Sequence, residues 1–133
     1  PGTRMARCAE PDMNEMLRTL AAARLILGGE MNIQAPPNLA DGDFARYLQA
    51  GIDDWGGVSP LTPDHINPEA AWPQIARLRA ETARCGYTLR ERLALHPQYA
   101  RAAQRWLDPA LQPRLAAYLD AGGFVRAEEE VLV

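Results

Sequence analysis

The first clear pattern in the chain is helical. Apolar side chains recur at spacings of three, four and seven residues, which predicts one apolar stripe along a helix over 13–27 made by Met13, Met16, Leu17, Leu20 and Leu27. Asp12 is a favourable N-cap residue, and Glu15 three positions later completes the pattern of a capping box. Gly28 and Gly29 predict the end of this helix.

Short extended runs then alternate with helices. Residues 31–35 alternate apolar and polar until two prolines end the run, which predicts a short strand. A second helix is predicted over 43–50 and a very short strand over 52–55. A third helix is predicted to hold Pro73 in its first turn and to end at Gly86, with one face formed by Ile75, Leu78, Thr82 and Cys85.

The regular order breaks after Gly86. Apolar residues alternate along 87–97, a pattern that predicts an extended or irregular segment. A weakly favoured helix is predicted to follow, up to Arg105. Asp108 and Pro109 predict the start of a last helix, closed by Gly122 and Gly123, with one face formed by Leu111, Leu115 and Leu119. The acidic run 128–130 is typical of a frayed tail.

Helices that alternate with short strands are typical of parallel βα units, and they predict an α/β fold. Two short parallel strands cannot form a stable sheet alone, because parallel sheets are buried on both faces and need more neighbours. We therefore expect part of a (β/α) TIM-type barrel over residues 1–86, with two short parallel strands and flanking helices, and a mainly helical extension over 87–133.

In such a barrel the functional groups lie at the carboxyl ends of the strands and in the loops that follow. Those ends are polar here, at 34–38 and 55–59, and the second one opens the stretch 51–72, which is rich in acids, glycines and prolines and contains a Trp and His65. Prolines forbid a helix there, and glycines permit a close backbone approach. We interpret this stretch as the mouth of a site.

The composition of the chain excludes several classes of function. The chain has 133 residues, 47% of them apolar and 23% charged, which is typical of one globular domain. A net charge of −3 argues against nucleic-acid and anionic-membrane partners, and no apolar run is long enough to span a membrane. All fourteen basic residues are arginine, so Schiff-base chemistry on lysine is excluded within these residues.

Cysteine usage points to a reducing compartment. Cys8 and Cys85 lie 77 positions apart, a spacing that suits neither a disulfide framework nor a metal knuckle. We therefore expect a cytoplasmic protein. Because the chain begins at Pro1 and not at Met, we also expect a piece of a longer protein.

Two sequence runs carry a resemblance to a known family. The run Met31 to Leu39 (MNIQAPPNL), followed by the segment 51–72 with its Trp-Gly-Gly-Val-Ser-Pro and Asp-His-Ile-Asn-Pro-Glu motifs, resembles the carboxyl-terminal portion of the radical S-adenosylmethionine FO synthases, in the half or subunit that closes the deazaflavin ring. FO is 7,8-didemethyl-8-hydroxy-5-deazariboflavin. The resemblance covers most of the chain, from Pro1 to Pro109, and departs at Asp53, where we expect Asn.

The resemblance implies both the chemistry and a missing part. Such enzymes hold a 4Fe–4S cluster on a Cys-x3-Cys-x2-Cys motif near the start of the barrel, and neither cysteine here belongs to such a motif. It therefore implies the last quarter of a radical S-adenosylmethionine barrel, with the cluster ligands absent from this chain. In the family, a 5′-deoxyadenosyl radical acts on a tyrosine-derived hydroxybenzyl adduct of 5-amino-6-(D-ribitylamino)uracil, which cyclises with release of ammonia. The implied partners are this small-molecule substrate, the remainder of the barrel, and the radical S-adenosylmethionine half or subunit that makes the adduct.

Position and chemistry select the candidate site residues. We expect those that face the substrate or S-adenosylmethionine to be Gln34, Asn38, Asp54, Trp55, Gly56, Gly57 and Ser59. Each has a structural alternative: a satisfied interior amide for Gln34, core packing for Trp55, a tight turn for the glycines. For Asp64 and His65 we favour a role in fastening the loop over metal binding. The catalytic residues stay unassigned, and no metal site is predicted.

Two other classes of function remain open. A small metal-dependent hydrolase would bring together the carboxylates and imidazole of Asp53, Asp54, Asp64 and His65. A non-enzymatic helical interaction module would instead show a compact bundle with an exposed apolar groove and no polar strand ends. The isolated 133 residues are expected to be inactive under the family interpretation.

Overall fold

The protein is described by a computed structural model, which covers residues 4–5, 7–40, 42–59 and 61–126. The chain divides into two compact units, Pro1–Thr88 and Leu89–Val133. The assignment of these units to a barrel part over 1–86 and an extension over 87–133 stays a prediction. The predicted acidic tail at 128–130 lies outside the described residues.

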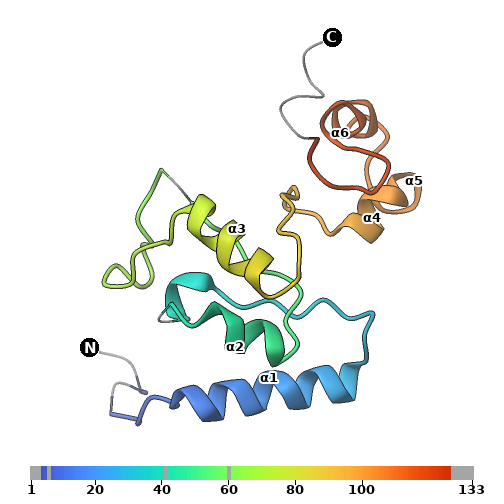
Figure 1. The fold of residues 1–133 in the computed structure, drawn as a ribbon. Coiled ribbons are helices and arrows are strands. Elements are labelled where there is room, and N and C mark those ends of the chain that lie inside the picture. Colours follow the sequence, from blue (N-terminus) through green and yellow to red (C-terminus); the bar gives the residue numbers. More distant parts are fainter. Residues whose placement is uncertain (1–3, 6, 41, 60, 127–133) are drawn as a thin grey trace. The chain divides into compact units, whose positions relative to one another are not determined.

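The first unit is built on three α-helices and one short 3-10 helix. They are α1 (Met13–Leu27), η1 (Pro37–Leu39), α2 (Phe44–Gln49) and α3 (Ile75–Arg84). In Figure 1, α2 lies between α1 and α3, and α2 is in contact with both of them. The predicted helices over 13–27 and 43–50 are confirmed, and the third begins two residues after the predicted Pro73.

Residues close to each end of α1 determine where this helix begins and ends. The Asp12 side chain accepts a hydrogen bond from the backbone N–H of Glu15 (2.8 Å), and the Glu15 side chain accepts one from the N–H of Asp12 (3.1 Å). This is the predicted capping box, and it satisfies two donors that a helix start leaves unpaired. At the other end Gly28 has φ +78°, a left-handed value that glycine adopts without strain.

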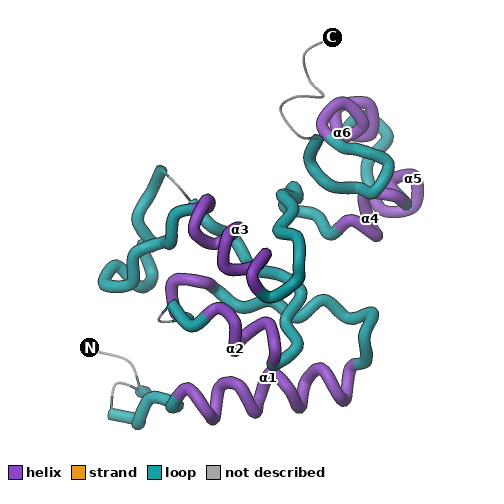
Figure 2. The backbone as a smooth tube through the Cα atoms, in the orientation of Figure 1, coloured by secondary structure: helices purple, strands orange, loops and turns teal. Residues whose placement is uncertain are grey.

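The predicted strands over 31–35 and 52–55 are not formed. In the described residues, which Figure 2 draws as helices and loops, the two segments meet in a single parallel bridge between Gln34 and Asp54. The direction and the pairing are as predicted, but the pairing does not extend. Parallel pairs need buried neighbours on both sides, and Pro36 and Pro37 lack the N–H that a longer ladder requires. The regular secondary structure of the described residues is thus helical, and these residues do not show the barrel.

A small apolar core holds the first unit together. Its centre is Trp55, which is 6% exposed, meets the ring of Phe44 edge-on at 5.4 Å and donates its indole N–H to Thr82 (3.3 Å). Leu78 and Thr82 bring the predicted inner face of α3 to this core. The buried residues of the unit come from the segments over 33–55 and from α3, and they are Ile33, Ala35, Pro37, Ala40, Phe44, Tyr47, Leu48, Ile52, Trp55, Leu78 and Thr82.

Up to residue 126, where the description ends, the second unit contains three short helices, α4 (Pro97–Arg101), α5 (Ala103–Trp106) and α6 (Gln112–Tyr118), and an antiparallel bridge between Leu119 and Val125. The predicted helix up to Arg105 is broken at Ala102. The predicted start at Asp108 and Pro109 is wrong, because Asp108 instead caps a turn by accepting from the Ala110 N–H (2.8 Å). Within the described residues, no helix has the length and apolar character needed to cross a membrane.

Candidate functional site

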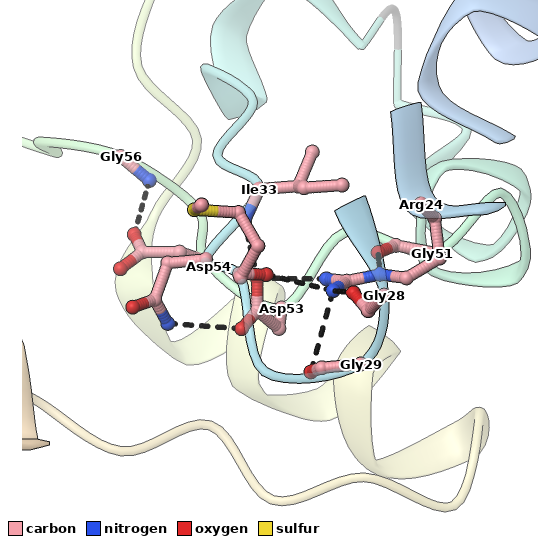
Figure 3. A network of polar contacts seen from close by, with 10 residues as sticks. Arg24, Gly28, Gly29, Ile33, Gly51, Asp53, Asp54 and Gly56 are labelled. Atoms are coloured by element: carbon pink, nitrogen blue, oxygen red, sulfur yellow. Dashed lines mark hydrogen bonds and ion pairs between the residues drawn. The ribbon is translucent and has the colours of Figure 1, made fainter. Parts of the chain in front are cut away.

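A polar network joins the end of α1 to the two bridged segments (Figure 3). The Arg24 guanidinium donates to the carbonyls of Gly28 (2.8 Å), Met31 (2.7 Å) and Gly51 (2.7 Å) and to the carboxylate of Asp53 (3.1 Å). The Arg24 side chain is 20% exposed. All three guanidinium nitrogens are therefore engaged within the protein.

The Asp53 carboxylate forms the other half of this network. Oδ1 accepts from the backbone N–H of Ile33 (2.6 Å) as well as from Arg24, and Oδ2 accepts from the amide of Asn32 (3.0 Å). The backbone of the same two residues is also bonded: the N–H of Asp53 donates to the Ile33 carbonyl (3.1 Å). The carboxylate thus occupies the N–H of Ile33 that a longer ladder would pair with a carbonyl, which is a second reason why the pairing ends after one bridge.

Two glycines bracket the segment that carries Asp53, and each accommodates a side chain from another segment. Gly51 has φ +101°, and a Cβ added to it would lie 2.8 Å from Cγ of Arg24. Gly56 has φ +57°, and a Cβ added to it would lie 2.8 Å from Nε2 of Gln34. Both positions require bare backbone in a left-handed conformation.

Gln34, Asp54 and Gly56 form a polar cluster at the bridge. The Asp54 Oδ1 accepts a hydrogen bond from the N–H of Gly56 (2.8 Å), and Gln34 is the bridge partner of Asp54. The side chain of Gln34 is exposed, with its amide against Gly56. This cluster presents a carboxamide, a carboxylate and bare backbone, which together can hydrogen-bond a polar ligand.

Asn38 belongs to a different network, which fastens the loop after residue 59. Its amide nitrogen donates to the Asp64 carboxylate (2.9 Å) and to the carbonyl of Ala70 (3.2 Å). Asp64 also accepts from the Asn67 side chain (3.1 Å) and from the N–H of Ile66 (2.9 Å). These donors, first of all the Asn67 amide, lower the pKa of Asp64 to about 2, so the carboxylate is ionised at neutral pH. Asp64 thus has the loop-fastening role that we favoured.

The remaining predicted residues do not share the contacts of the cluster. Ser59 is half-buried, and its hydroxyl accepts from the N–H (3.0 Å) and from the hydroxyl (2.7 Å) of Thr62, so it stabilises a turn. Gly57 is exposed, with open space where a side chain would begin. Trp55 is buried in the core, where it packs and does not face solvent. The structure therefore brings Gln34, Asp54 and Gly56 together. Trp55 and Gly57 adjoin them in sequence, but the Trp55 side chain turns into the core and Gly57 faces open space, whereas Asn38 and Ser59 belong to the contacts of the following loop.

The geometry does not favour the two alternative classes of function. Asp53, Asp54 and Asp64 bind three different sets of partners, and His65 is exposed. Among the described residues, no group of three or more His, Cys, Asp or Glu side chains is placed to hold a metal ion. A helical interaction module was expected to have no polar strand ends, whereas this structure has a polar cluster where the two predicted strands are bridged.

A hollow in the second unit is a weaker candidate site. It is lined by side chains from α4, α5, α6 and the turn after α6, including Arg101, Asp120 and Arg126. Both arginines donate to backbone carbonyls (2.9 Å each), and Asp120 is bound by Arg90. The hydrogen bond from Arg90 and a smaller contribution from the Phe124 N–H hold the pKa of Asp120 below its ordinary value. These charges serve the local fold.

Sequence reasoning missed Arg24, which is central to the network in Figure 3. It lies in an apolar stretch of α1, and its partners are up to 29 residues away in sequence. One signal was available: an arginine is the single charged residue in the last seven positions of that helix, AAARLIL. A charge isolated in this way commonly has a specific partner.

Comparisons with known proteins identify close relatives. The FO synthase of Streptomyces avermitilis is 47% identical over 132 residues, which are 98% of this chain and 15% of that protein. The FO synthase of Mycobacterium tuberculosis is 49% identical over 126 residues, 93% of this chain and 15% of that protein. The 7,8-didemethyl-8-hydroxy-5-deazariboflavin synthase of Archaeoglobus fulgidus is 42% identical over 125 residues, 94% of this chain and 37% of that protein.

The similarity therefore extends along almost the whole chain, and the chain spans 15% to 37% of the length of these relatives. No family model and no solved structure matches the chain. The resemblance inferred from the runs 31–39 and 51–72 is confirmed.

Proposed function

We propose that this chain, a homologue over nearly its whole length of one segment of the FO synthases, forms part of a radical S-adenosylmethionine lyase. The reaction is ring closure of the hydroxybenzyl adduct of 5-amino-6-(D-ribitylamino)uracil to the FO chromophore, with release of ammonia. The observation that carries the proposal is the identity of 42% to 49%, over more than nine tenths of the chain, with relatives named FO synthase or 7,8-didemethyl-8-hydroxy-5-deazariboflavin synthase.

In this proposal the chain supplies part of the wall of the site. Gln34 would hydrogen-bond the substrate or S-adenosylmethionine, a role supported by its exposed amide, which lies against the bare backbone of Gly56. Asp54 holds the backbone of Gly56 in its left-handed turn. Asn38 and Ser59 act at one remove by fastening the loop over 59–72, and Gly57 leaves open space for a ligand.

The cluster ligands are not in this chain. A 4Fe–4S cluster of this type requires three thiolates, and the sequence contains two cysteines, of which Cys8 is exposed and Cys85 is half-buried. These residues do not fit the cluster. We therefore assign the cluster to parts of the enzyme outside these 133 residues, and we assign this segment to the substrate or S-adenosylmethionine side of the site.

The proposal includes partners and a location. The remainder of a TIM-type barrel would pair with the bridged segments along their other edges, since parallel pairing is stabilised by neighbours. A second radical S-adenosylmethionine half or subunit would supply the adduct. The separated cysteines support a cytoplasmic enzyme, and the net charge of −3 supports a small molecule over nucleic acid as its substrate.

A segment exchange tests the proposal. The matching segment of the Mycobacterium tuberculosis FO synthase, which is 49% identical, would be replaced by this chain. The purified chimera would be assayed anaerobically for fluorescent FO with tyrosine, 5-amino-6-(D-ribitylamino)uracil, S-adenosylmethionine and a reductant. We expect FO to form. A chimera that is folded and binds its cluster but makes no FO would contradict the proposal, and a chimera carrying Gln34→Ala serves as the control for the site.

A further inference from the structure

We propose that Asp53, held by Arg24, is a positioning residue for the candidate site. It fixes how segment 31–35 pairs with segment 52–56, and so sets the place of the Gln34 amide against Gly56. Its effect on catalysis rests on the proposed function, whereas its effect on geometry does not. Nothing in the sequence resemblance assigns this role, because Asp53 is the position at which the chain departs from the expected residue.

The two neighbouring carboxylates have different tasks. In Figure 3, Asp53 lies on the side of Arg24, whereas Asp54 lies on the side of Gly56. Their hydrogen bonds agree: Asp53 binds Arg24, Asn32 and the N–H of Ile33, and Asp54 binds the N–H of Gly56. Asp53 is therefore placed to act through the backbone and not by touching a ligand.

Asp53 adjoins two of the three residues of the cluster, and the third, Gly56, is bonded to Asp54. Its Oδ1 fixes the N–H of Ile33, the residue before Gln34, and Asp53 itself directly precedes Asp54. A slip of one residue in such a pairing moves every side chain to the opposite face. A single bridge resists such a slip weakly, so the side-chain carboxylate supplies the missing constraint.

Arg24 holds this carboxylate from the other side. It also binds the carbonyls of Gly28 and Met31, at the end of α1 and at the start of the first segment, and the carbonyl of Gly51, at the start of the second. One guanidinium therefore connects the helix end to both segments, a geometry that suits the planar fork of arginine and not the point charge of lysine.

Four variants separate the contacts. Asp53→Ala removes all three acceptor contacts and leaves the Ile33 N–H without this partner. Asp53→Asn retains an oxygen for Ile33 and Arg24, and its new amide can bind Asn32 once the Asn32 amide rotates. Of the three bonds that Asp53 accepts, Asn32→Ala removes only the one to Oδ2. Arg46→Gln is the matched control, because Arg46 likewise ties α2 to α1 through Asn14 (2.8 Å) but touches no member of the cluster.

The test is amide hydrogen exchange, measured by NMR on the 133-residue chain. We expect Asp53→Ala to speed exchange at Ile33 and Gly56 by roughly tenfold or more, while Asp53→Asn and Arg46→Gln leave both rates close to those of the unmodified chain. If Asp53→Ala does not fold, Asn32→Ala is expected to raise the same two rates by a smaller factor. Unchanged rates in the folded Asp53→Ala chain, or in Asn32→Ala, would overturn the inference, as would equal effects of Asp53→Ala and Asp53→Asn.

The chimeric FO synthase gives the second measurement. There we expect Asp53→Ala to lower kcat by about tenfold or more with a smaller change in KM, and Asp53→Asn to restore kcat. Arg46→Gln should change thermal stability without changing kcat. A chimera with the unmodified segment that makes no FO would refute the proposed function, whereas the exchange rates would still decide the role of Asp53.

Discussion

Gly56→Ala probes the candidate site because alanine adds one carbon where the backbone must stay bare. Gly56 has φ +57°, a left-handed conformation that costs an L-residue about 1–2 kcal/mol. The added Cβ would lie 2.8 Å from Nε2 of Gln34, the end of a flexible side chain that can swing aside. We therefore expect the free energy of unfolding to fall by about 1–2 kcal/mol, mostly from the backbone, and the Gln34 amide to leave its place.

Gly57→Ala is the matched control. Gly57 is not among the glycines with positive φ, and no atom lies within 4 Å of an added Cβ. We expect this variant to be as stable as the unmodified chain or more stable by about 0.4–1 kcal/mol, since alanine restricts the unfolded state. The larger Gly57→Val should also fold, but in the chimeric FO synthase it should lose turnover, because a branched side chain would fill the space proposed for the ligand.

Urea unfolding followed by tryptophan fluorescence measures both effects, because the buried Trp55 becomes exposed. FO fluorescence from the chimera measures function. Equal unfolding free energies for Gly56→Ala and the unmodified chain would refute the left-handed geometry at Gly56. An unchanged turnover number for Gly57→Val would remove Gly57 from the site.

Four further predictions follow from particular contacts. Gly51→Ala should destabilise the chain more than Gly56→Ala in the same urea assay, because its Cβ would lie 2.9 Å from Cβ of Arg24, which cannot swing away from its helix; equal losses would contradict this. The pKa of Asp64 is lowered to about 2 from an ordinary value of 3.8, so its contribution to stability is present above the ordinary value and is lost as the pH falls through about 2. An NMR titration that places this pKa near 3.8 would show that the loop network is absent. The 133 residues alone, reconstituted with iron and sulfide, should show neither 4Fe–4S absorption nor 5′-deoxyadenosine formation, because two cysteines cannot supply three thiolates; a stoichiometric cluster would disprove this. Leu25 and Ile26 are neighbours near the end of α1 and are 85% and 81% exposed, so we expect the isolated chain to self-associate through them. Leu25→Gln with Ile26→Gln should then reduce self-association in sedimentation velocity, whereas Leu111→Gln, at a less exposed residue (51%), should not; a profile that the double variant leaves unchanged would contradict this.

Local signals were sufficient for α1. Its start is fixed by Asp12 and Glu15 and its end by Gly28, so all the information lies within a few residues of each boundary. The second unit shows the limit of such signals. Asp108 has the chemistry of a helix cap but closes a turn, and α6 begins at Gln112, where Pro113 supplies a φ already suited to a first helical turn.

The length of the predicted strands and the roles of the site residues depend on contacts between residues that are far apart in sequence. The carboxyl ends of parallel segments meet at one edge, which is why the grouping of Gln34 with Asp54 and Gly56 was predictable. The length of the pairing was not, because it depends on neighbours and on the side chain of Asp53. Nor was the role of Asn38, which depends on Asp64, 26 positions away in sequence. A tryptophan can pack in a core or stack on a ligand, and the sequence alone does not distinguish these roles for Trp55. Its burial in the structure does.

The bonds of Arg24 also imply an order of folding events. The capping box of α1 joins residues three apart, so this helix can begin to form within about 0.1–1 μs. Arg24 and Asp53 are 29 residues apart, and closing that loop carries an entropic cost that grows with its length. The helix should therefore precede the network. Substitutions at Asp12 should then slow folding, and substitutions at Asp53 should mainly speed unfolding, so the residue that positions the candidate site would govern how long the folded unit lasts more than how fast it forms.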